Sequence, residues 1–106
     1  MKFDMNKMLK EAQRMQEELA KAQEQAASEV VEASSGGGVV TVKANGAGEV
    51  LEIKIDPRAV DPDDPELLAD MVLAAVNEAL RSAQSLMQSK VSGLIPGDLG
   101  GLGSML

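Results

Sequence analysis

The chain has 106 residues, a formal net charge of −7, one aromatic residue, and neither cysteine nor histidine. That length fits one domain, and the missing residue types remove the usual nucleophiles, bases and zinc ligands, so neither an enzyme nor a cofactor or metal is expected. No signal peptide or membrane-length apolar run is present, which predicts a cytoplasmic protein without membrane contact. An apolar core without large aromatic side chains buries little apolar area for a monomer, so we expect an oligomer.

Residues 5–27 are predicted to form a helix with a narrow apolar stripe. Apolar residues alternate there at spacings of three and four, the a and d positions of a heptad repeat. The stripe consists of Met5, Met8, Ala12, Met15, Leu19, Ala22 and Ala26. Such a stripe needs a second helix to cover it, either from this chain or from another copy. The basic residues of this helix lie on its outer face: Lys7, Lys10, Arg14 and Lys21.

Three β-strands are expected next, forming an antiparallel meander over residues 30–35, 39–44 and 49–55. Val40, Val42 and Ala44 alternate on one face, and Leu51, Ile53 and Ile55 are predicted to point inward from the third strand. The glycines at 36–38 predict the first hairpin loop. The Asn-Gly pair at 45–46 predicts the second, because both residue types tolerate positive φ.

A second long helix is predicted over residues 65–91. Asp64 is a suitable N-cap and Pro65 suits the first helical position. The apolar stripe of this helix is broad enough to cover the sheet. Asn77 is equally compatible with a buried and a solvent-facing position. We expect one α+β domain over residues 1–92, followed by a Gly-rich tail over 93–106 that is mobile or ordered only against a partner.

Two patterns resemble ligand sites but have simpler explanations. The carboxylates of Asp61, Asp63 and Asp64 could bind a hard cation, but prolines interrupt them and a helix N-terminus attracts acids anyway. The three glycines at 36–38 lack the lysine and hydroxyl residue of a phosphate-binding loop.

The basic face of the first helix has two interpretations. Glu residues three or four positions from its basic residues form pairs that solubilise a helix, and this reading is favoured by the residues alone. A duplex DNA surface is the alternative, to which Arg81 and Lys90 of the second helix would add charge.

In its order of elements and motifs the chain resembles the YbaB/EbfC family of small bacterial nucleoid-associated proteins. The likeness covers nearly the whole chain. It is carried by Met8, Lys10, Ala12-Gln13, Met15-Gln16, Gly37-Gly38, Val40, Val42, Asn45-Gly46, Ile53, Ile55, Asp56-Pro57, Leu67-Leu68, Asp70, Ala75, Asn77 and Ala79.

This resemblance implies an α-β-β-β-α protomer, with a three-stranded antiparallel meander between two long helices, and a homodimer whose helices project like tweezers. It also implies binding to duplex DNA with little sequence preference, in the organisation of the nucleoid or gene regulation. The residues that match that role are Lys7, Lys10, Arg14 and Lys21, with Arg81 and Lys90 beside them. The alternative function is a protein-interaction module that uses the acidic surface, the Met/Ala/Leu stripe and the Leu-rich tail.

Overall fold

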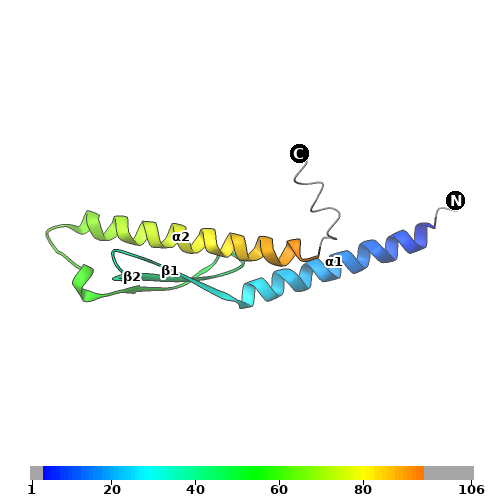
Figure 1. Cartoon of the computed structure of the whole chain (residues 1–106), viewed down its shortest axis with the longest axis horizontal. Helices are drawn as coiled ribbons and strands as arrows, with labels where there is room; N and C mark the ends of the chain where they lie inside the picture. Colours follow the sequence, from blue (N-terminus) through cyan, green and yellow to red (C-terminus); the bar gives the residue numbers. More distant parts are fainter. Residues whose placement is uncertain (1–3, 95–106) are drawn as a thin grey trace.

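The computed structural model describes residues 4–94, in which two long helices accompany a three-stranded sheet (Figure 1). The elements follow the predicted α-β-β-β-α order. They are α1 (Met5–Ser28), β1 (Val30–Ser35), β2 (Val40–Asn45), β3 (Val50–Ile55), the short 3-10 helix η1 (Pro57–Ala59) and α2 (Pro65–Ser92).

The sheet is the predicted antiparallel meander, with strand order β1-β2-β3. The glycines at 36–38 form the predicted first hairpin turn, and all three have positive φ. The second turn differs, because neither Asn45 nor Gly46 has positive φ. Instead, the Asn45 side-chain oxygen accepts hydrogen bonds from the backbone N–H groups of Ala47 (3.0 Å) and Glu49 (3.1 Å). Asparagine therefore acts here through its side chain, as in an Asx turn.

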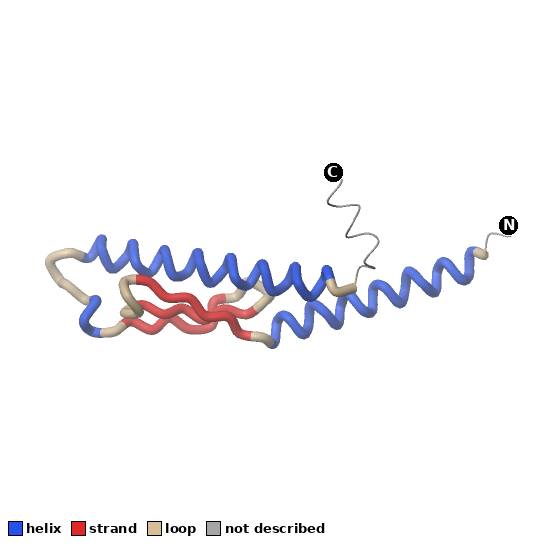
Figure 2. The backbone as a smooth tube through the Cα atoms, in the orientation of Figure 1, coloured by secondary structure: helices blue, strands red, loops and turns tan. Residues whose placement is uncertain are grey.

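Helix α2 begins where the Asp64 carboxylate accepts a hydrogen bond from the N–H of Leu67 at 3.2 Å, and it covers one face of the sheet (Figure 2). Its Ala75, Ala79 and Ala83 are fully buried against the sheet, and the largest fully buried side chains of the described residues are those of Val40 and Val42. Small helix residues let the backbone of α2 approach the sheet closely, but such a core buries little apolar volume. Asn77 faces solvent on the opposite side of this helix, so it is not a buried polar residue.

The burial expected of β3 is not found. Ile53 and Ile55 do pair with Val42 and Val40, and paired residues share a face of the sheet. Yet Leu51, Ile53 and Ile55 are 52%, 45% and 41% exposed. The reason is the position of α2, which packs mainly on β1 and β2 and barely reaches β3.

Helix α1 leaves the end of the sheet and runs past the end of α2 (Figure 1). Only its last turns, at Ala22 and Ala26, are buried. The radius of gyration is 20.2 Å, whereas a compact domain of this length is expected at about 13 Å. The N-terminal half of α1 thus forms a projecting arm. Within residues 4–94, no helix is both long and apolar enough to cross a membrane. The predicted tail lies outside the described residues except for Gly93 and Leu94.

Candidate nucleic-acid interface

The basic residues of α1 share one side of the projecting arm. The helix starts at Met5 because the Asp4 side chain accepts a hydrogen bond from the N–H of Lys7 at 3.2 Å. The spacings of three, four and seven residues that follow place the four basic side chains on one helical face. We call this the basic face of α1; it consists of Lys7, Lys10, Arg14 and Lys21, all exposed.

Arg14 differs from the other members of this face because it is held by two carboxylates. Its guanidinium lies 2.8 Å from Glu11 and 3.1 Å from Glu18. The side-chain hydrogen bond to Arg14, reinforced by the charge of its guanidinium, lowers the pKa of Glu11. The hydrogen bond with Glu11 and the negative charge of its carboxylate in turn raise the pKa of Arg14. The positive charge of Arg14 is therefore largely compensated within the helix.

The three lysines of the basic face are not compensated in this way. Among residues 4–94, no carboxylate lies within salt-bridge distance of the ammonium groups of Lys7, Lys10 or Lys21. Lysine ammonium groups are compact, strongly hydrated point charges on long flexible stems. An exposed row of them suits a flexible, repeating anion such as a phosphate backbone better than a single shaped ligand.

Lys90 has a structural partner. Its ammonium group lies 2.7 Å from the carboxylate of Glu29, the residue that caps the end of α1. This ion pair joins the end of α2 to the base of the arm. Lys90 also lines a groove of about 170 Å³ together with Lys21 and Glu18, so the structure brings these two predicted basic residues together.

Arg81 lies elsewhere. It is on the part of α2 that runs along the sheet, and its guanidinium pairs with Glu78 at 2.7 Å. It does not extend the basic face of α1.

The acidic loop has a local structural role. The Asp61 carboxylate accepts a hydrogen bond from the N–H of Asp63 at 2.9 Å, and Asp64 caps α2. Across residues 4–94, no group of three metal-ligating side chains comes together. This loop lies at the end of the molecule opposite the N-terminus of α1 (Figure 1), so the acids and the basic face are well separated.

Sequence reasoning missed two contacts at the base of the arm. One is the Lys90–Glu29 pair. The other joins the second turn of the sheet to α1: the N–H of Gly46 donates a hydrogen bond to the carbonyl of Ala26 at 2.8 Å. A Cβ at position 46 would collide with that carbonyl, so this glycine permits a close approach. No local pattern indicates either contact, because the partners are far apart in sequence.

Comparison with known proteins identifies the family to which this chain is similar. Residues 1–99 match the YbaB/EbfC DNA-binding family. A nucleoid-associated protein of Acetivibrio thermocellus is 48% identical over 99 residues, covering 93% of this chain and 87% of the relative. One from Moorella thermoacetica is 53% identical over 95 residues, covering 87% of this chain and 91% of the relative. The crystal structure of an uncharacterized protein, HP0035 from Helicobacter pylori, shares the fold, with a TM-score of 0.78 and 21% identity over 90% of this chain and all of that one.

Proposed function

The chain belongs to the YbaB/EbfC DNA-binding family of nucleoid-associated proteins, which are not enzymes, and we propose that it binds duplex DNA as a homodimer through the basic face of α1. The observation that carries this proposal is the row of exposed lysines, without carboxylate partners among residues 4–94, on an arm that projects from the body. Contacts between these lysines and DNA phosphates would supply the affinity.

The same face supports binding with little dependence on base sequence. Arginine is the side chain that most often reads guanine, through two parallel hydrogen bonds. Arg14, the only arginine on this face, is engaged by Glu11 and Glu18. The lysines that remain suit phosphates, which carry no direct sequence information.

The net charge of −7 does not oppose this proposal, because charge is unevenly distributed. Residues 56–70 carry six acids and one arginine, and their loop lies at the far end from the arm (Figure 1). Charges separated by more than a Debye length, about 8 Å at physiological salt, interact weakly. DNA lying along the arm would be largely screened from these acids.

The uncovered apolar surface supports the homodimer. The face of β3 that carries Ile53 and Ile55 is exposed beside α2. On α2, Leu80 and Met87 lie next to the β2–β3 turn, and Leu73 is one heptad before Leu80 on the same side of the helix. An edge strand also offers unpaired backbone groups. A second copy placed here would cover the apolar surface and join two arms in one particle.

A salt series tests the DNA surface. For the wild-type protein and duplexes of two unrelated sequences, we expect similar affinities that fall steeply between about 50 and 200 mM salt. The triple variant Lys7→Gln, Lys10→Gln and Lys21→Gln should bind more weakly at every salt concentration. The slope of log K against log salt should lose about one unit for each lysine that contacts phosphate.

A control variant keeps the net charge of this triple variant but changes the body. It carries Lys43→Gln, Lys54→Gln and Arg58→Gln, all outside α1, and it should retain the wild-type slope. If the two triple variants lose affinity equally, net charge rather than the basic face determines binding, and the proposal is wrong.

A further inference from the structure

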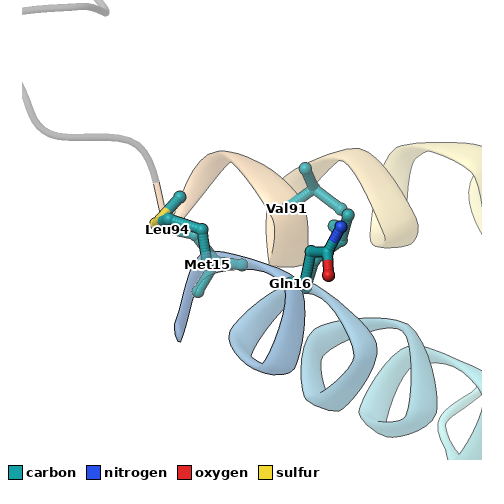
Figure 3. Close-up of a pocket in the computed structure, with 5 residues that line it drawn as sticks. Met15, Gln16, Val91 and Leu94 are labelled. Atoms are coloured by element: carbon teal, nitrogen blue, oxygen red, sulfur yellow. The ribbon is translucent and has the colours of Figure 1, made fainter. Parts of the chain in front are cut away.

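We infer that the last segment of this chain, residues 95–106, packs along the apolar side of the α1 arm. The arm meets the end of α2 at a groove of about 260 Å³ lined by Met15, Gln16, Leu19, Val91 and Leu94 (Figure 3). Leu94 is the last described residue, so the chain continues directly from this groove. The inference does not depend on DNA binding.

The groove opens onto a longer uncovered surface. The heptad stripe predicted from the sequence is buried only at Ala22 and Ala26, because α2 ends before it reaches the rest of the arm. Farther along the stripe, Met15 is 41% and Met8 is 54% exposed. Apolar side chains aligned in this way on a helix that leaves the body favour burial against another segment.

The charges beside the stripe disfavour pairing with the same arm of a second copy. In the heptad frame, the flanking g positions hold Glu11 and Glu18, and the e positions hold Leu9 and Gln16. Antiparallel arms would bring glutamates face to face. Parallel arms would place each glutamate beside an uncharged side chain. Neither arrangement supplies the opposite charges that usually fix a coiled-coil partner.

The segment that follows Leu94 has the complementary composition. Its twelve residues include one charged side chain, Asp98, and four glycines. Its large apolar residues are Ile95, Leu99, Leu102, Met105 and Leu106. Glycines allow a backbone to lie close to a surface, and the apolar residues offer side chains for the methionines of the stripe.

The segment is also long enough. Twelve extended residues reach up to about 40 Å, while the stripe from Leu19 back to Met5 rises by about 21 Å along the helix. By helical period, the stripe lies on the side opposite the basic face of α1. A tail bound there would leave the lysines exposed and would cover the apolar side of the arm.

Methionine methyl NMR tests this packing. Met8 and Met15 report on the stripe, and Met71, which packs next to Gly36 at the other end of the fold, is an internal control. Deletion of residues 95–106 should shift the Met8 and Met15 methyl signals and leave Met71 unchanged. The full-length double variant Leu99→Ser and Leu102→Ser should shift both signals in the same direction. The variant Ser104→Ala should not. Unchanged Met8 and Met15 signals in the deletion would overturn the inference.

A spin label separates the chain's own tail from that of a second copy. The natural chain has no cysteine, so Ser104→Cys gives a single attachment site. With the label and the ¹³C-methionines in the same chain, we expect broadening of the Met8 signal. In dimers refolded from spin-labelled chains and separate ¹³C-labelled chains, Met8 should stay sharp. Equal broadening in the mixed dimers would show that a second copy supplies the tail and would contradict the inference.

Discussion

Gly46 is required for contact rather than for backbone conformation. The Asn-Gly pair indicated a turn, and a turn is present, but the glycine's φ is not positive. The space that a side chain would need is occupied by the carbonyl of Ala26, to which Gly46 donates a hydrogen bond. The Asn-Gly pair therefore predicted the turn correctly, but the physical reason for the glycine is different from the expected one. A close contact with a distant helix cannot be deduced from two neighbouring residues.

We predict that Gly46→Ala destabilises the protein. The new methyl group must push the end of α1 away from the turn, and overpacking of this kind costs about 1–3 kcal/mol. Urea unfolding should show a lower free energy of unfolding of that size. Ala47→Ser, at an exposed position of the same turn, should change it by less than about 0.5 kcal/mol. Equal stabilities for the two variants would contradict the close approach.

Glu11 controls how much charge Arg14 presents. Its pKa is lowered by the hydrogen bond and charge of Arg14, so the pair is intact at neutral pH. A carboxylate with a lowered pKa contributes stability above its unfolded-state pKa. That contribution is lost as the pH falls through the lowered value. Both side chains are exposed, so the effect on folding is small and the effect on surface charge is the more useful observable.

We therefore predict that Glu11→Gln strengthens DNA binding at low salt, by about two- to fivefold. The substitution removes one negative charge and frees part of the Arg14 guanidinium. Glu24→Gln removes the same charge from the same helix, but among the described residues Glu24 forms no ion pair. Fluorescence anisotropy with one duplex should show a larger gain for Glu11→Gln. If the gains are equal, Arg14 does not contribute to binding.

At the scale of elements, the direction of the arm depends on contacts at its base. The Lys90–Glu29 pair and the Gly46–Ala26 hydrogen bond connect the end of α1 to α2 and to the sheet. From the sequence alone, Lys90 is placed with the basic residues that could contact DNA, because the sequence of a predicted helix does not show which carboxylate a lysine pairs with. With 30% of its side chain exposed, it is better placed to orient the arm.

A double-mutant cycle distinguishes these roles of Lys90. We predict that Lys90→Met and Glu29→Gln show a coupling energy of up to about 1 kcal/mol in urea unfolding, as expected for a partly exposed ion pair. The salt slope of DNA binding should change little in Lys90→Met. Zero coupling together with a slope reduced by about one unit would make Lys90 a phosphate contact instead.

Most of the secondary structure follows from local patterns. The heptad spacing predicted α1, alternating β-branched residues predicted the strands, and Asp64-Pro65 marked the start of α2, all as observed. The burial of β3 was not predictable, because alternation shows which residues share a face but not how far a covering helix extends. The apolar stripe of α1 was identified correctly, but its length beyond the end of α2 depends on the tertiary arrangement.

At the scale of the whole molecule, the protomer exposes a large apolar surface and has only a small apolar core. This combination is unfavourable for a monomer. The core of the described residues consists of alanines and valines, while four large residues of β3 and Leu73 of α2 remain exposed. Burial of about 100 Å² of apolar surface is worth about 2.5 kcal/mol, so a second copy on this surface would add much of the missing stabilisation. Dimerisation would also double the number of lysines that one particle presents to DNA.

The final prediction concerns this surface. Replacing one residue on each of its two elements, Ile53→Thr and Leu73→Gln, removes apolar area where the second copy is proposed to bind, while keeping a β-branched residue in the strand. Sedimentation equilibrium at micromolar concentration should give a dimer mass for the wild type and a shift toward the monomer mass for this variant.

The control pair, Val30→Thr and Leu67→Gln, also changes one exposed apolar residue on a strand and one on α2. Val30 lies on the sheet face away from α2, and Leu67 points about 120° around the α2 axis from Leu73 by helical period, so the control should remain a dimer. When one arm of a dimer binds DNA, the second arm is held close to the same DNA at a high effective concentration. The monomeric variant lacks this second arm, so it should also lose more DNA affinity than the two surface substitutions alone would cause. A wild-type monomer, or equal dissociation of both variants, would place the interface elsewhere or remove it.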